Sequence, residues 1–185
     1  MDNVDRNAIK SLIIPGWGEK SLNNDERSKI FFISEASLWV SFLSSNYLNN
    51  WYKDNYITFG SHHAGIDLDL INESQLSLLI VHMSQYDSME DYNETMDRQR
   101  RNSSYSDDKY SWNWDSDSNR NTFNDLRIKS ANAKKINNFT ISALILNRFI
   151  SFFDVVYLNG KEYNIDSSVV PTSNDGLLFN CTISF

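Results

Sequence analysis

Three histidines and two aspartates are the residues of this chain that could hold a metal ion. His62 and His63 are adjacent, Asp67 and Asp69 follow shortly after them, and His82 lies further along. The chain has neither the H-E-x-x-H pattern nor paired cysteines, and adjacent histidines on a loop rarely bind one ion together. We therefore expect no metal site here.

Nucleophilic catalysis and nucleotide binding find no support in the sequence either. No G-x-S-x-G turn and no glycine-rich phosphate-binding motif is present. The single cysteine, Cys181, lies in a predicted strand, where we expect a small buried residue. We expect a protein that is not an enzyme and that binds no cofactor.

Aromatic side chains are the candidate ligand-binding residues. Aromatic faces with neighbouring Asp and Asn suit a sugar or an extended peptide. The alternative is that the same side chains only pack the middle of the chain against its helices, which is the commoner role of large aromatics. The candidates are Trp51, Tyr52, Tyr56, Trp112 and Trp114, with Tyr110 beside them.

Two ionisable residues stand out because of their apolar surroundings. Glu35 is the only charged residue of the stretch from residue 30 to 48, and Arg148 lies in the middle of the apolar stretch from 139 to 158. An unpaired charge in such surroundings is costly in protein and in lipid alike. We predict that Glu35 and Arg148 form a structural ion pair. Asp154 is the competing partner, but it lies about 120° around the helix from Arg148.

Length and composition indicate one mainly α-helical domain. A chain of 185 residues can bury a core of its own, and its net charge of -7 excludes a general nucleic-acid binder. Only two prolines and six glycines are present, which favours long regular elements. We predict a long antiparallel helical hairpin with a short helix before it, a helical and loop excursion between its arms, and a small C-terminal β-hairpin. The predicted ranges are 4–14 for the short helix, 26–59 and 121–158 for the arms, 60–120 for the excursion and 163–185 for the β-hairpin.

Local signals place the ends of these elements. Pro15 with Gly16 and Gly18 predicts a helix stop, with Trp17 as an aromatic plug. Ser88 is the expected N-cap of a polar helix. Elsewhere, Asn24 or Asp25 can cap the first arm, GSHHAG (residues 60–65) is expected to form a turn, and Asn174-Asp175-Gly176 is expected to turn the β-hairpin.

Small and polar residues recur along one face of each arm. In water such a stripe is the solvated face of an amphipathic helix, whereas in a membrane it is a seam for close helix contact. The stripes predict a register for the antiparallel pair. Ser34, Ser37, Ser41 and Ser44 are expected opposite Ser151, Asn147, Ala143 and Thr140, respectively.

Each apolar stretch is long enough to cross a bilayer or to run through a small soluble core. Trp51, Tyr52 and Tyr56 follow the first stretch, as the aromatic residues of a membrane interface do. The N-terminal residues MDNVDRNAIK do not form a signal peptide, because they are acidic and lack an apolar segment. Export is therefore left open by the sequence.

Several stretches in order along the chain resemble an uncharacterised family of bacterial envelope proteins. They are SLIIPGWGEK, FISEASLW, NWYKDNY, WNWDSDSNR and LILNRFISFFD, between residues 11 and 154. That family is a domain of unknown function with a P-G-x-G opening turn followed by a membrane-like helical hairpin. The resemblance implies a mainly helical fold and an envelope location, and it implies no activity.

From the residues and the resemblance together we expect a non-enzymatic, membrane-associated envelope protein with a structural or interaction role. Its expected partner is the membrane or another envelope protein, with no nucleic acid and no small-molecule cofactor. The alternative is a soluble helical binding module that uses its Trp- and Tyr-rich head to hold a sugar or peptide.

Overall fold

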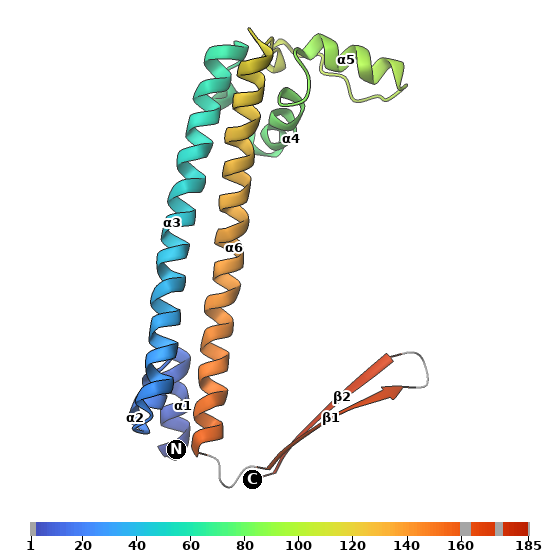
Figure 1. Cartoon of the computed structure of the whole chain (residues 1–185). Helices are drawn as coiled ribbons and strands as arrows, with labels where there is room; N and C mark the ends of the chain where they lie inside the picture. The colour runs from blue at the N-terminus through green and yellow to red at the C-terminus, as the bar shows by residue number, and fades with distance from the viewer. Residues whose placement is uncertain (1–2, 160–163, 173–175, 185) are drawn as a thin grey trace. The chain divides into compact units, whose positions relative to one another are not determined.

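The computed structural model describes residues 3–159, 164–172 and 176–184, with side chains described for residues 6–159. The described chain is mainly helical, as predicted (Figure 1). Its α-helices are α1 (Asn3–Ile13), α2 (Trp17–Ser21), α3 (Asp25–Ala64), α4 (Glu73–Met83), α5 (Met89–Arg98) and α6 (Asp117–Asn159). Short 3-10 helices form at Leu68–Leu70 and Asp108–Tyr110.

Two strands follow the helices. β1 (Asn164–Thr172) pairs antiparallel with β2 (Gly176–Ser184), with Asn164 opposite Ser184 and Thr172 opposite Gly176. Of the predicted turn Asn174-Asp175-Gly176, the first two residues lie outside the described residues, and Gly176 begins β2. The side chain of Cys181 also lies outside them.

The chain forms two compact units, where the sequence suggested one domain. Unit 1 comprises Met1–Ser41 with Phe139–Phe185, and unit 2 comprises Phe42–Asn138. Both α3 and α6 contribute to each unit, and within each unit the two helices lie side by side (Figure 1). The units are described separately below.

In unit 1, α1 and α2 lie beside the start of α3 and the end of α6 (Figure 1). α1 ends before Pro15, as predicted, and Gly16 has a φ of 96° that favours glycine. The expected aromatic plug is wrong, because Trp17 begins α2 with 43% of its surface exposed. Close packing explains the second glycine: a Cβ on Gly18 would lie 2.4 Å from the backbone oxygen of Asn7.

Two predicted caps are confirmed. The Asn24 side chain accepts a hydrogen bond from the Arg27 amide at 3.3 Å at the start of α3, and Ser88 caps α5 by accepting from the Asp91 amide at 3.1 Å. The predicted turn at residues 60–65 is wrong for residues 60–64, since α3 continues to Ala64. Gly60 does not break the helix because it allows close packing: an added Cβ would meet Phe123 at 3.1 Å and Leu68 at 3.2 Å.

The core of unit 2 is aromatic and apolar. It is formed by residues of the segment between the two long helices together with residues of α3 and α6. The indole N–H of Trp112 donates to the Tyr86 carbonyl at 3.2 Å, and that of Trp114 donates to the Met83 carbonyl at 2.7 Å. The Trp-rich loop is thereby fixed against α4. The members of the cluster include Tyr56, Leu68, Leu79, Met83, Tyr92, Trp112, Trp114 and Phe123.

Candidate functional site: the polar interior of unit 1

Unit 1 contains an ion pair between a buried carboxylate and a half-buried guanidinium of its two long helices. The Arg148 Nη2 atom on α6 lies 2.6 Å from the Glu35 Oε1 atom on α3. Only 11% of the Glu35 side chain and 28% of the Arg148 side chain are exposed. The structure therefore brings together the two charges that the sequence singled out.

Further donors surround the same carboxylate. Trp39 Nε1 donates to Glu35 Oε1 at 3.0 Å, and Asn147 Nδ2 donates to Glu35 Oε2 at 2.9 Å. The guanidinium is also held by its own helix, because Arg148 Nη1 donates to the Leu144 carbonyl at 3.0 Å. Both oxygens of Glu35 thus accept hydrogen bonds, which is what a charge in a poorly solvated interior requires.

A second buried carboxylate, Glu19, was not identified from the sequence. The hydroxyl of Ser11 donates to its Oε2 atom at 2.8 Å, and the hydroxyl of Ser151 donates to its Oε1 atom at 2.6 Å. The backbone amides of the turn complete the network: Gly16 donates to Ser151 Oγ at 3.0 Å and Gly18 to Ser11 Oγ at 2.9 Å. The P-G-x-G turn therefore ties α1 and α2 to α6 through a fully buried Glu.

The third acidic residue of this region pairs elsewhere. Asp154 on α6 forms a salt bridge through its Oδ1 atom with Arg27 Nη1 on α3, so it does not compete for Arg148. Its Oδ2 atom is buried and has no hydrogen-bond partner within the described residues.

The predicted register of the two polar stripes is wrong by about one helical turn. Ser41 was expected opposite Ala143, but its hydroxyl lies 3.3 Å from that of Thr140. Asn147 was expected opposite Ser37, but it donates to Glu35, and Ser37 is exposed. The contact face of α3 follows Glu35, because the buried charge needs the polar groups of α6 more than the serines do.

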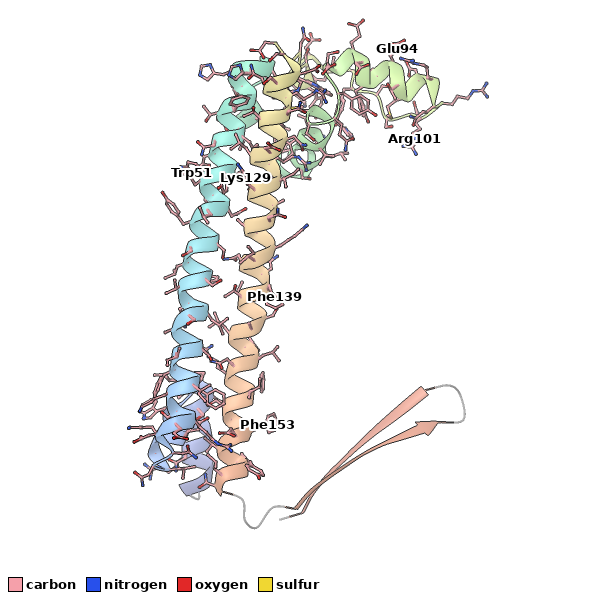
Figure 2. All side chains as sticks on the ribbon, in the orientation of Figure 1. Trp51, Glu94, Arg101, Lys129, Phe139 and Phe153 are labelled. Carbon is pink, nitrogen blue, oxygen red and sulfur yellow. The ribbon has the colours of Figure 1, made fainter. Side chains whose placement is uncertain are left out.

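Over residues 30–40 of α3 and 139–157 of α6 the outer surface of unit 1 is apolar, although the interior beneath it holds Glu35, Asn147 and Ser151. Apart from Ser37, every exposed side chain from residue 30 to 40 of α3 is apolar or aromatic, and Ser142 is the corresponding exception from residue 139 to 157 of α6. Figure 2 shows Phe139 and Phe153 projecting from α6 away from α3, and they are 76% and 58% exposed. Polar groups inside and apolar groups outside reverse the usual distribution of a water-soluble protein.

The aromatic candidates do not share one accessible surface. Tyr56, Trp112 and Trp114 are buried in the core of unit 2, whereas Trp51 is exposed and projects from α3 (Figure 2). Tyr52 is half-buried and contacts Trp51 edge to face at a centroid distance of 4.9 Å. The buried indoles have structural roles, so the five residues do not form a common ligand platform.

The histidines also have separate surroundings. His63 Nδ1 lies 2.7 Å from Asp115 Oδ2, and this hydrogen bond lowers the pKa of Asp115. His82 Nδ1 lies 2.8 Å from the Tyr105 hydroxyl, and burial lowers the pKa of His82. Within residues 6–159, no group of three or more His, Cys, Asp or Glu side chains is placed to hold a metal ion.

No protein-family model, curated protein or solved structure matches this chain. The geometry of the polar interior and of the apolar surface around it is therefore the basis for assigning a role.

Proposed function

We propose that the chain is a non-enzymatic, membrane-associated protein of the cell envelope. In this proposal α3 and α6 are the arms of a long antiparallel helical hairpin whose apolar stretches lie in the bilayer. The aromatic head, unit 2, lies outside the bilayer. Its role is structural or interactive, with the membrane or another envelope protein as partner.

The apolar outer surface of unit 1 is the observation that carries this proposal. The exposed apolar run on α6, from residue 139 to 157, is about 28 Å long at the helical rise, close to the thickness of a hydrocarbon core. Within α6 an 18-residue window reaches a mean hydropathy of 1.6 with only 22% of it buried. A core helix of a water-soluble protein would be mostly buried, so lipid is the better match for this surface.

The buried charges support the same role. Ionisable residues within membrane segments face the interior of a bundle and pair with each other, as Glu35 and Arg148 do. Aromatic side chains also mark the ends of the apolar stretches: Tyr157 is exposed near the end of α6, and Trp51 is exposed on α3 after Leu48. Such positions suit the interfacial layer of a membrane.

The composition of α3 supports membrane insertion less strongly than that of α6 does. Among the described residues only α6 is apolar and long enough to count as a candidate span. The serines and Glu35 lower the hydropathy of α3. We propose that α3 enters the bilayer together with α6, with Glu35 covered by Arg148 and Asn147.

Cell fractionation tests this proposal. The expressed chain is expected in the membrane fraction after an alkaline wash, and in solution only after detergent is added. Ile145→Glu and Ile150→Glu should weaken retention because both residues are exposed, whereas Leu144→Ala alters a buried neighbour and should leave it unchanged. Recovery of the unmodified chain in the soluble fraction without detergent would contradict the proposal.

A soluble module that binds a sugar or peptide has less support. It would need Trp112 and Trp114 at an accessible surface, and they are 2% and 7% exposed.

A further inference from the structure

A cavity in unit 2 is lined by several cationic side chains, although the chain as a whole is acidic. It measures about 470 Å³, within the range of small-molecule sites, and it lies among α3, α4 and α6. Three cationic side chains line it, Lys53, Arg127 and Lys134, against one carboxylate, Glu73. The whole chain carries a net charge of -7, so this local excess of cations does not follow from composition.

The cavity is built by one face of each of the three helices. Asn49, Lys53 and Tyr56 recur at helical spacing on α3, as do Arg127, Ser130 and Lys134 on α6. On α4 the lining residues are Glu73, Leu76, Ser77, Ile80 and Val81, which also follow the helical repeat. Polar and cationic groups come from the two long helices, and most of the apolar wall comes from α4.

The cations of this cavity are not neutralised by acidic neighbours. Within residues 6–159, none of Lys53, Arg127 and Lys134 forms a salt bridge. Asn124, a neutral side chain, orients Arg127 by accepting from its Nε and Nη2 atoms at 3.2 and 2.8 Å. Ser130 is likewise held, since it donates to the Asn49 carbonyl at 3.1 Å.

The place of the cavity along the chain points to the class of ligand. Lys53 follows the apolar stretch of α3 by one helical turn, and Lys134 precedes that of α6 by a similar length. In a membrane protein these positions are at headgroup depth, where basic pockets between helices bind anionic headgroups. The mixed wall also suits an amphiphile, with its phosphate on the cations and its apolar part against Ile80 and Val81.

We propose that this cavity binds the phosphate-bearing headgroup of an anionic phospholipid, through Lys53, Arg127 and Lys134. The proposal rests on the membrane association inferred above. Free inorganic phosphate offers the same chemistry to the three cations, and the experiment separates the two sources.

The test uses the full chain purified in a neutral detergent. Binding of short-chain phosphatidylglycerol, short-chain phosphatidylcholine and inorganic phosphate is measured by the thermal shift that each produces, because a ligand that binds the folded state raises the melting temperature. Only phosphatidylglycerol is expected to bind well. Each lysine removed, by Lys53→Gln or Lys134→Gln, should weaken that binding about fivefold.

Lys135→Gln is the matched control, because Lys135 is adjacent, exposed and absent from the cavity wall. It should bind phosphatidylglycerol as the unmodified chain does. Equal losses at Lys134 and Lys135, equal binding of the two lipids, or binding of inorganic phosphate without lipid preference would each overturn the proposal. A chain that stays in the membrane fraction but shows no headgroup preference would refute this inference alone. A chain recovered without detergent would refute the membrane role itself.

Discussion

Glu35 receives donors from two helices, since Arg148 and Asn147 reach it from α6 and Trp39 from its own helix. Removing one charge leaves the other buried without its partner. We expect Arg148→Leu to lower the free energy of unfolding by about 3–5 kcal/mol. The double variant Glu35→Leu with Arg148→Leu should cost less than the sum of the two single changes.

Denaturant titration of the detergent-solubilised chain measures these costs as a double-mutant cycle. Glu26→Gln is the control, because Glu26 is exposed on the same helix. Additive costs for the two single changes would show that the carboxylate and the guanidinium do not stabilise each other.

Substitutions at two glycines distinguish the cost of a steric clash from the cost of backbone strain. A Cβ on Gly18 would lie 2.4 Å from both Asn7 O and Ser11 Oγ, so Gly18→Ala must displace backbone and disturb the Glu19 network. Gly65 has a φ of 72° but open space around it, so Gly65→Ala should cost only about 1–2 kcal/mol of backbone strain. We expect the larger loss of melting temperature for Gly18→Ala, and equal losses would argue against close packing at the P-G-x-G turn.

His82 makes the stability of unit 2 depend on pH. Its ring stacks on Tyr92 at 4.3 Å, and burial lowers its pKa, so the folded state binds the proton more weakly than the unfolded chain does. The contribution of neutral His82 to the free energy of unfolding is therefore fully present above the unfolded pKa of about 6.5. It declines as the pH falls from there towards the lower folded pKa. Burial raises the pKa of Tyr105 to about 12, so its hydroxyl keeps its proton throughout.

Melting curves across this pH range test the effect. His82→Phe should keep the stacking and remove the decline, whereas His62→Phe, at an exposed position, should leave it in place. An unchanged decline in His82→Phe would assign the titration to another group.

The two buried carboxylates differ in how far the sequence could identify them. Glu35 and Arg148 were recognisable because each is a charge within an apolar stretch. Glu19 lies in the locally polar segment WGEKS, which gave no sign that the chain buries it. Its burial depends on the close approach at Gly18 and on Ser151, which is distant in sequence. The polar stripe that contains Ser151 was the only available signal.

At the scale of the helices, the long segments were predictable and their contact register was not. Polar and apolar spacing indicated two long helices, but the serine stripe suggested a contact face through Ser34, Ser37, Ser41 and Ser44. The side chain that determines the face is Glu35, and it shifts the pairing by about one turn. Burying an unpaired charge costs more free energy than burying several hydroxyl groups, and the spacing of residues in the sequence contains no information about this difference.

Disulfide trapping tests the observed register. In a Cys181→Ser background, Ser41→Cys with Thr140→Cys should crosslink on oxidation, because the two hydroxyl oxygens lie 3.3 Å apart. Ser37→Cys with Thr140→Cys is the control, since Ser37 is exposed one turn away, and it should remain reduced. Crosslinking of the control pair alone would contradict the register.

At the scale of the whole molecule, the two units bury different kinds of groups. Unit 2 has an aromatic core of the kind found in water-soluble domains. Unit 1 buries Glu19, Glu35, Asn147 and Ser151 beside Leu144 and Val155, and it exposes most of the large apolar side chains of residues 30–40 and 139–157. The sequence left both a membrane segment and a soluble core open, because apolar stretches of this length serve either purpose. A membrane segment and a soluble core differ in which side of each helix is buried. That side can be identified only when the pairing of the helices is known.

Spin labels placed along α6 test most directly whether the apolar surface of unit 1 contacts lipid. With the full chain in liposomes, labels replacing Ile145, Phe149 and Phe153 should collide with dissolved oxygen and be shielded from a water-soluble nickel complex. A label replacing Lys135 should show the reverse, and one at the buried Leu144 should be shielded from both. Free access of the nickel complex to the label at residue 145 would contradict a lipid-facing surface.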